Sequence, residues 1–440
     1  MASLMIERAK AALKNAFVGD ALAMPVHWFY NPADIYKAFP LGIEQFEDAP
    51  SFHPSSIMSL HSTQQGGRAN KASASQKEIV GEIILKGKRQ YWGKDNIHYH
   101  QGMKAGENTL NAHCARIVLT CALKGYDTDQ FLNQYISFMR ADEPKHPDTY
   151  AESYHRGFFA NLEQGTPAEK CGAVTHDTAS IGALVSVTPL AVVEAAKHTA
   201  LEDVKRLCRS HLYLTHPDES LASVCDFYVE LIYKLMHRED EPPKDILGEI
   251  ARSSAGMNLA ELTAKNKSDI EIVGRMYSPA CYISDAWPAV LYFAYRYADT
   301  PKKALMANTN VGGDNVHRGF VLGALLGLIH GVEITPWFSE LTDAKKLNSL
   351  IDSLDIQYIR YKGCVILPVK RTVNYQYKGY RSLVLRFTLI SIEAKPYSVT
   401  VSPVLAALNI AFTILISASP SLPVTIGCRP AIMAKASLSI

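Results

Sequence analysis

The fold of this 440-residue chain is decided by residues 312–331, GGDNVHRGFVLGALLGLIHG. From Gly319 onward a glycine recurs at every fourth position, so Gly319, Gly323 and Gly327 lie along one ridge of a helix. Each interior glycine costs a helix about 1 kcal/mol relative to alanine, and close approach of a neighbouring helix is the usual compensation. The apolar run is too short to span a bilayer. The segment therefore predicts a buried central helix.

Stretches before this helix also have the periodicity of helices. Apolar residues recur at spacings of three and four in residues 108–125, 179–198, 222–239 and 288–299. Strand-like alternation is scarce between residues 107 and 350. We therefore expect an all-α fold, a compact helical bundle.

Residues 26–75 differ from this bundle because they are rich in His, Pro, Ser and Gly and show little periodicity. Such a composition predicts a long loop or a series of short turns, which makes a loop-rich N-terminal insertion. The aromatic and imidazole side chains in or beside it are those of His27, Trp28, Tyr30, His53 and His61. They either stack on a base and line a cavity or only hold the loop together.

The chain changes character near residue 350, which divides it into a domain at 1–350 and a tail at 351–440. Residues 358–400 are basic, aromatic and rich in Val and Ile, whereas residues 396–428 carry no charge. Three interpretations stay open: a membrane anchor built on the weak apolar segment 403–419, a small β-rich appendage, and a disordered or aberrant extension. We expect a weakly structured tail and no membrane span, because Asn409 and nearby prolines interrupt the apolar segment.

The composition, with 48% hydrophobic and 20% charged residues, is typical of a soluble globular protein. The net charge is +2, with about −5 in residues 1–350 and about +7 in the tail. A slightly acidic body offers no basic stripe, so we expect no nucleic-acid partner. The eight cysteines form no CxxC pair, and charges at Glu7, Arg8 and Lys10 interrupt the first apolar stretch. Both features predict a cytoplasmic protein with free thiols.

Two short polar segments stand where helices are expected to begin. They are residues 106–109 (GENT) and residues 308–319 (NTNVGGDNVHRG). Free backbone N–H groups at a helix N-terminus favour anions such as phosphate. The pair Gly312 and Gly313 lets a ligand approach the backbone closely. Together they predict a ligand site.

These segments resemble motifs of a known family. Residues 312–328 resemble the C-terminal signature of ADP-ribosylglycohydrolases, Gly-Gly-Asp-Thr-Asp-Thr followed by a Gly/Ala-rich helix. GDAL at 19–22 resembles the opening motif of that family, LTHP at 214–217 its mid-chain Thr-His motif, and residues 180–190 the helix before it. The ordered set covers about residues 5–350. AMPVHWFYN and HYHQGMKAGEN are also similar to a branch that includes the J1-type crystallins, family members regarded as structural proteins.

The resemblance implies an all-α fold, two Mg²⁺ ions, and hydrolysis of the N- or O-glycosidic bond that joins ADP-ribose to an acceptor. The partner would be an ADP-ribosylated protein or a small-molecule ADP-ribose conjugate. Carried onto this sequence, the metal ligands are Glu107, Asn108, Asp314 and His317, with Glu107 and Asp314 catalytic. The family has Thr/Ser-Asp-Asp and Asp-x-Asp-Thr in these runs, so the ligand charge falls here from about −4 to about −2. We therefore expect a degenerate site that holds one magnesium ion or none.

The substrate-binding residues implied by the resemblance are Asp20, Asn108, Gly312, Gly313, Asn315 and His100. A set of His317, Asp314, Glu107 and either His98 or His100 would suit Mn, Fe or Zn better than Mg. Otherwise these histidines only line a pocket. The leading hypothesis is a hydrolase of an ADP-ribosyl or related N-glycosidic bond. The alternative is a catalytically silent protein that binds ADP-ribose or has a structural role like the crystallins.

Two further candidates are weaker. Glu152 and Arg156 lie four residues apart and predict an ion pair on a helix rather than a phosphate site. Cys281 has no base at a spacing that indicates a nucleophile.

Overall fold

The computed structural model describes residues 2–354 except 57, 60–77, 176 and 335, and beyond them the backbone of strands at 360–361, 364–368, 373–377, 380–390 and 409–413. The chain divides into two compact units, Met1–Asp355 and Ile356–Ile440. Each unit is described by itself.

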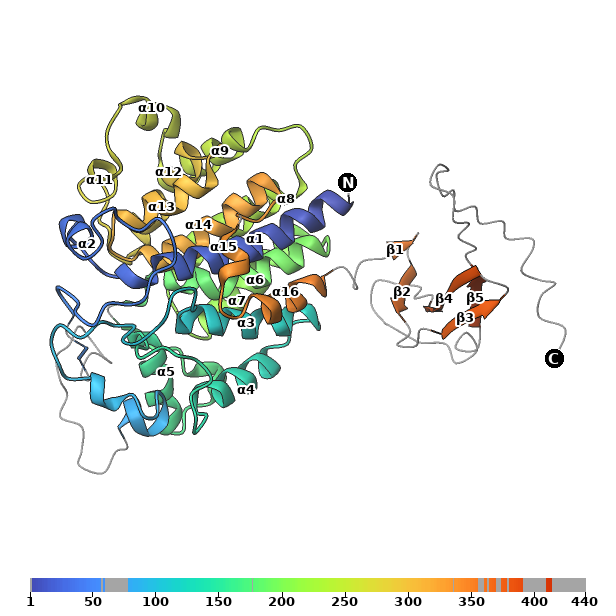
Figure 1. Cartoon of the computed structure of the whole chain (residues 1–440), viewed down its shortest axis with the longest axis horizontal. Helices are drawn as coiled ribbons and strands as arrows, with labels where there is room; N and C mark the ends of the chain where they lie inside the picture. Colours follow the sequence, from blue (N-terminus) through green and yellow to red (C-terminus); the bar gives the residue numbers. More distant parts are fainter. Residues whose placement is uncertain are drawn as a thin grey trace. The chain divides into compact units, whose positions relative to one another are not determined.

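The first unit is all-α in its described residues, as the sequence predicted (Figure 1). Its α-helices are α1 (Ala2–Ala23), α2 (Pro32–Ala38), α3 (Leu110–Leu123), α4 (Thr128–Met139), α5 (Ser153–Glu163), α6 (Gly182–Ala196), α7 (Leu201–Tyr213), α8 (Glu219–His237), α9 (Pro243–Ala255), α10 (Leu259–Ala264), α11 (Asp269–Ile272), α12 (Ile283–Arg296), α13 (Pro301–Asn310), α14 (Asn315–His330), α15 (Trp337–Glu340) and α16 (Ala344–Asp352). Short 3-10 turns lie at Met24–Val26, Arg89–Tyr91 and Ala168–Lys170, and a π turn lies at Ile79–Ile83.

The buried central helix is α14, whose residues from Asn315 to Ile329 are all buried. Its glycine ridge lies against α1, which runs alongside it in Figure 1. A Cβ on Gly319, Gly323 or Gly327 would come within 2.6, 2.1 or 2.3 Å of the backbone oxygens of Gly19, Asn15 and Ala11, respectively. Because the α1 partners descend as the α14 positions ascend, the two helices are antiparallel. The glycines therefore allow backbone-to-backbone packing, which confirms the prediction of close helix approach.

The N-terminal insertion is mostly irregular where it is described, with only the turn at Met24–Val26 and the short helix α2 before residue 57. Backbone hydrogen bonds join it to residues 96–103: His53 N donates to Asn96 O, His98 N to Ser51 O, and Ala49 N to Met103 O. This pairing holds the histidine-rich segment at 98–100 next to residues 25–29. His61 lies outside the described residues.

The second unit contains an antiparallel sheet of five strands, β1 (Arg360–Tyr361), β2 (Cys364–Pro368), β3 (Val373–Tyr377), β4 (Tyr380–Ile390) and β5 (Asn409–Thr413). The order is β1-β2-β4-β3, and β5 also pairs with β4. Of the three interpretations left open for the tail, the β-rich appendage is the one these strands match. Within the apolar segment 403–419, only 409–413 is described, as β5. Among the described helices, none combines the length and apolar character needed to cross a bilayer.

Candidate active site

The start of α14 is fixed by a tight glycine turn. Gly312 and Gly313 have φ of +73° and +66°, a region that favours glycine. A Cβ on either would lie 2.0 Å from a backbone oxygen, that of Phe29 or of Pro279. Gly313 N donates to Phe29 O, and its own carbonyl accepts from Trp28 N, each at 2.8 Å. The turn therefore joins α14 to the segment after α1 and carries Asp314, the residue before the first helical position, into the core.

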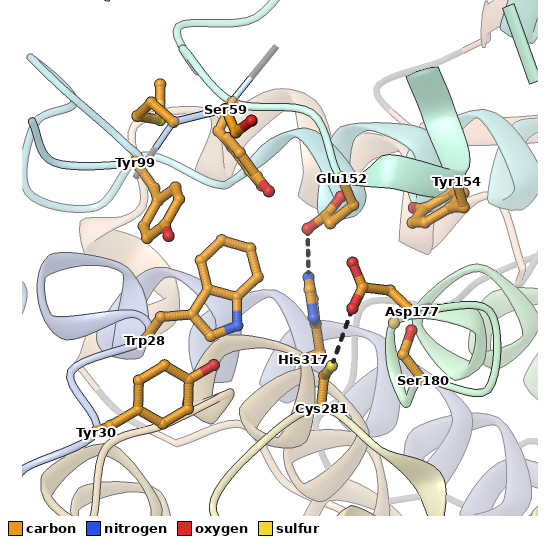
Figure 2. A pocket seen from close by; sticks show the side chains of 13 residues that line it. Trp28, Tyr30, Ser59, Tyr99, Glu152, Tyr154, Asp177, Ser180, Cys281 and His317 are labelled. Atoms are coloured by element: carbon orange, nitrogen blue, oxygen red, sulfur yellow. Dashed lines mark hydrogen bonds and ion pairs between the residues drawn. The ribbon is translucent and has the colours of Figure 1, made fainter. Parts of the chain in front are cut away.

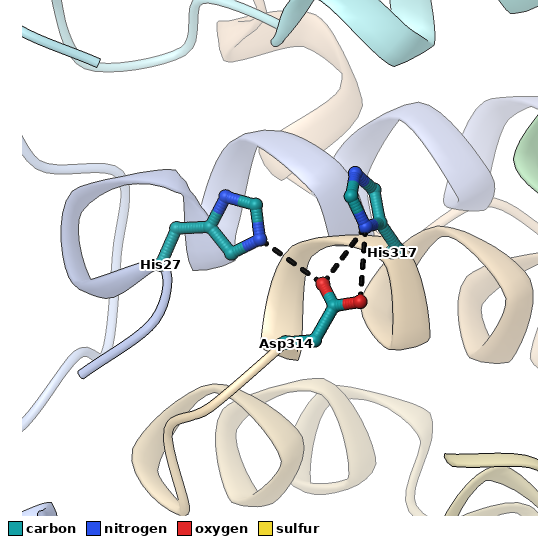
Figure 3. A group of neighbouring side chains, drawn as sticks. All are labelled: His27, Asp314 and His317. Carbon is teal, nitrogen blue, oxygen red and sulfur yellow. Dashed lines mark hydrogen bonds and ion pairs between the residues drawn. The ribbon is translucent and has the colours of Figure 1, made fainter. Parts of the chain in front are cut away.

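Asp314 lies between two imidazoles (Figure 3). Its Oδ1 is 3.0 Å from Nε2 of His27 and 2.8 Å from Nδ1 of His317, and its Oδ2 is 3.0 Å from the same His317 nitrogen. All three residues are at most 2% exposed. One donor atom from each lies within 4.8 Å of the others, an arrangement compatible with a metal ion.

Each imidazole has a further partner on its outer side. Nδ1 of His27 lies 2.7 Å from Nε2 of His100, whose Nδ1 lies 2.8 Å from Oδ1 of Asp148. On the other side, Nε2 of His317 lies 3.2 Å from Oε1 of Glu152. The result is a chain of contacts through six side chains, named here the buried relay: Asp148, His100, His27, Asp314, His317 and Glu152.

Burial and charge act against each other along the buried relay. Burial alone would raise the pKa of Asp314, but the charges and hydrogen bonds of His317 and His27 hold it well below its usual range. Burial alone would lower the pKa of His317, but Asp314 and Glu152 outweigh this and raise it well above 6.5. For His27, burial dominates and holds the pKa well below 6.5. His317 is therefore the cation of the pair, and Asp314 is ionised.

A cavity opens above His317 (Figure 2). Its enclosed volume is about 170 Å³, which is smaller than the about 300–1,000 Å³ of typical small-molecule sites, so only part of a ligand fits inside it. Its aromatic lining consists of Trp28, Tyr30, Tyr99, Tyr150 and Tyr154, and its other lining residues are Met58, Ser59, Glu152, Asp177, Ser180, Gly182, Cys281 and His317. The cavity therefore combines aromatic walls with two carboxylates and one imidazole.

Trp28 is placed in this cavity by a strained backbone. Its φ of +61° is costly for a bulky side chain, typically about 1–3 kcal/mol. The hydrogen bond from Trp28 N to Gly313 O and stacking of its ring on His27, with centroids 3.7 Å apart, offset the strain. Strained residues of this kind cluster at ligand sites. Of the alternatives left open for these aromatic residues, lining a cavity is the one that Trp28 and Tyr30 match.

The structure does not bring Glu107 and Asn108 to this cavity. Glu107 Oε2 accepts a hydrogen bond from Lys104 N and closes its own turn. Asn108 donates to Asp20 Oδ1 and Phe17 O and accepts from Arg116. The side chain of Asp20 is completely buried and also accepts from the backbone and hydroxyl groups of Thr109. These residues tie the start of α3 to α1, because buried polar groups must find partners.

The remaining predicted ligand-binding residues also have structural partners. Gly312 N donates to Thr309 O, and Gly313 N to Phe29 O, so neither amide is available to a phosphate. Asn315 is completely buried and donates to Val26 O and Thr309 O. His100 belongs to the buried relay, and His98 lies 3.0 Å from Pro25 O. Among the described residues, the cavity lining includes only His317 from the predicted site set.

This donor set does not fit two magnesium ions. Magnesium prefers an octahedral shell of carboxylates, hydroxyls and water. The described group near Asp314 offers one carboxylate and two imidazoles, and Val316 is an apolar side chain in the core. The carboxylate of Glu107 is held elsewhere. These residues therefore do not supply the ligand shell of a magnesium pair.

Asp177 was not among the residues predicted from the sequence, and Glu152 was predicted only as the partner of Arg156 in an ion pair, yet both line the cavity. Glu152 is the residue before α5, and its carboxylate faces His317 and, at 3.7 Å, His155. Arg156 lies over the Trp92 ring and donates to Ala151 O, so its guanidinium is used in packing. Asp177 accepts from the Ser153 hydroxyl at 3.0 Å. Its position just before the predicted Ser180–Gly182 motif was the only sequence signal for it.

Cys281 also lines the cavity, with its sulfur 4.0 Å from Asp177. Burial and the nearby charges of Asp314 and Asp177 raise the pKa of its thiol well above 9. The thiol therefore stays protonated at neutral pH, which makes it a poor nucleophile.

Comparison with known proteins agrees with the signature residues. A model of the ADP-ribosylglycohydrolase family matches residues 1–362. This chain belongs to the ADP-ribosylglycohydrolase family. Among solved structures, a chain titled "ADP-ribosylglycohydrolase-related protein complex" is similar, with 16% sequence identity and a TM-score of 0.49. That match covers 80% of this chain and 98% of the other. The curated proteins give no match.

Membership of the family allows residues 312–319 to be compared with the family's C-terminal signature. As an ADP-ribosylglycohydrolase family member, the chain keeps the glycine turn and Asp314 at the start of α14 and has His317 three residues later. The similarity to the J1-type crystallin branch stays a prediction.

Proposed function

We propose that this ADP-ribosylglycohydrolase family member hydrolyses an ADP-ribosyl or related N-glycosidic bond in the cavity above His317. The observation that carries the proposal is the shared presence of Glu152, Asp177 and His317 in one aromatic-walled cavity. Water would attack the anomeric carbon of the ribose as the bond to the leaving group breaks. One carboxylate takes the proton of the water, and the other supplies a proton to the leaving atom.

The aromatic walls suit the flat parts of a nucleoside-like ligand. Stacking of a base on an aromatic side chain contributes about 1–3 kcal/mol. Trp28 and Tyr30 lie at one side of the cavity in Figure 2, and Tyr30 is 49% exposed, which places it at the mouth. The described lining contains no Lys or Arg, so we expect the cavity to hold the glycosyl end of the ligand. A pyrophosphate group would lie outside it.

His317 has a positioning role in this proposal. Its ring is fixed by Asp314 on one side and by Glu152 on the other. The cationic ring keeps the Glu152 carboxylate oriented toward the cavity. Asp314 therefore acts on the reaction through His317.

The test is release of ADP-ribose from N- and O-linked ADP-ribosyl conjugates by the wild type and by Glu152→Gln, Asp177→Asn and Glu107→Gln. We expect the first two variants to lose at least about 100-fold in kcat, the usual effect of removing an acid–base group. Glu107→Gln is the matched control and should stay within about twofold. A loss in Glu107→Gln equal to that in Glu152→Gln would contradict the proposal.

A catalytically silent ADP-ribose-binding protein is the second candidate. This second candidate is favoured by the hydrogen bonds of Glu107 and Asn108 within the protein. These two residues occupy positions that hold metal ligands in the family pattern, and here their side chains are not available to a metal. Binding of ADP-ribose by calorimetry, without release of ADP-ribose from any conjugate, would support it over the hydrolase.

A further inference from the structure

The buried relay needs more positive charge than its neutral side chains provide. It contains five successive contacts between electron-rich atoms, which run from Asp148 through the three histidines and Asp314 to Glu152. Each contact requires a hydrogen or another cation between its two atoms. Three neutral imidazoles supply three hydrogens. With neutral rings, two contacts are therefore left without one. The cationic His317 of the metal-free chain fills one of them, and the contact of His27 with Asp314 still lacks a hydrogen.

The outer partners decide where those two contacts lie. Asp148 already accepts hydrogen bonds from the backbone of Leu110, Thr149 and Tyr150, so Nδ1 of His100 must donate to it. With neutral rings, Nε2 of His100 then accepts from Nδ1 of His27. The remaining lone pair of His27, on Nε2, points at Asp314.

The same reasoning applies on the cavity side. When Nε2 of His317 donates to Glu152, the lone pair on Nδ1 points at Asp314 as well. The amide of Asn111 lies 2.8 Å from Nε2 of His317, with its nitrogen toward the ring. Turned over, the amide presents its oxygen to His317 and its two N–H groups to Tyr154 Oη and His155 Nε2, both of which can accept. Both lone pairs therefore converge on one carboxylate.

We propose that His27, Asp314 and His317 bind one divalent transition-metal ion of the zinc or ferrous-iron class. The ion supplies at one point the two positive charges that the buried relay lacks. Two imidazoles and one carboxylate are donors that such ions prefer and that magnesium does not. This site stands beside the proposed hydrolytic cavity, but its occupancy does not depend on turnover.

The spacing of the donors supports this assignment. Neighbouring ligand atoms on an ion with bonds of about 2.1 Å are about 3.0–3.4 Å apart. The contacts of Asp314 with the two imidazoles are 2.8–3.0 Å, a few tenths of an ångström short of that spacing, and all three donor atoms lie within 4.8 Å of one another. In addition, His27 is held from behind by His100 and Asp148, the kind of outer support that orients metal-binding histidines.

The experiment measures metal binding directly on the full-length chain without a histidine tag. Untagged protein is titrated with Zn²⁺ and with Co²⁺, the latter followed by its visible ligand-field absorption, and bound metal is counted by elemental analysis. We expect one ion per chain, retained in the presence of excess Mg²⁺. His27→Gln and Asp314→Asn should lose it, whereas His100→Gln should bind about 10–100-fold more weakly.

His211→Gln is the matched control, because His211 is buried in α7 outside the buried relay. It should bind metal like the wild type. Circular dichroism shows whether each variant folds. If Asp314→Asn does not fold, the weaker metal binding expected of His100→Gln still tests the proposal. Folded wild type that binds neither metal, or variants that bind as well as the wild type, would overturn the proposal. Metal binding without turnover would contradict only the proposed hydrolase.

Discussion

Replacing Gly323 by alanine tests the close packing of α14 on α1, which positions Asp314 and His317. A Cβ there would lie 2.1 Å from the backbone oxygen of Asn15, at least 1.3 Å closer than the ordinary contact of 3.4 Å. A backbone oxygen inside α1 cannot turn aside as a side chain does, so the two helices must separate. Overpacking of this kind typically costs about 1–3 kcal/mol, and it exceeds the gain of about 1 kcal/mol that alanine brings to a helix. Three backbone atoms lie 2.1, 2.6 and 3.0 Å from the added Cβ, so we expect the upper end of that cost, a net loss of about 2 kcal/mol in the free energy of unfolding.

Gly248→Ala is the matched control for this experiment. Gly248 is also a buried helical glycine, in α9, but its added Cβ would meet only the guanidinium of Arg252 at 3.5 Å. Alanine should therefore stabilise that helix by about 0.5–1 kcal/mol. The assay is denaturant unfolding followed by circular dichroism at 222 nm, which reports the helical unit. The packing argument would be refuted if Gly323→Ala were as stable as the wild type and Gly248→Ala were no more stable than the wild type.

Further predictions concern the turn, the thiol and pH. Gly313→Ala should lower both stability and ligand binding, because its φ is +66° and its Cβ would lie 2.0 Å from Pro279 O; unchanged binding by calorimetry would contradict this. Cys281→Ala should keep wild-type turnover, since burial raises the pKa of its thiol well above 9 and leaves no thiolate; a tenfold loss in kcat would show a chemical role. Burial lowers the pKa of His146 to about 4 and that of His211 to about 3. Both histidines are therefore neutral in the folded chain, whereas in the unfolded chain each takes up a proton below about pH 6.5. Their contribution to stability is thus complete above pH 6.5. Below that pH, each histidine lowers the free energy of unfolding by about 1.4 kcal/mol per pH unit. Unfolding titrations at pH 7 and pH 5 check this, and His211→Gln should show a smaller decrease than the wild type.

The helical fold was readable from the sequence because its signal is local. A glycine at every fourth position of residues 319–331 marks a helix ridge, and the structure shows α1 packed on that ridge. The tail was not readable in the same way. Its basic and uncharged stretches fit several structures, and pairing between strands such as β4 and β5 depends on contacts distant in sequence.

The site was only partly predictable, for a physical reason. Asp314 and His317 share one helical turn, so their proximity follows from spacing. Glu152 and Asp177 reach the same cavity through tertiary packing, which no local pattern reports. Glu107 was expected at the site because its position matches the family motif, but its longer side chain bonds to Lys104 N instead. Motif position alone does not show where a side chain points.

Calorimetry of ADP-ribose binding, with and without added Mg²⁺, tests the central claim most directly: the ligand site is the cavity of Trp28, Glu152 and His317 rather than a magnesium pair at Glu107 and Asp314. The account predicts binding that Mg²⁺ does not change, that weakens by about tenfold or more in Trp28→Ala through lost stacking, and that Glu107→Gln leaves intact. Binding that appears only with Mg²⁺ and disappears in Glu107→Gln would contradict it.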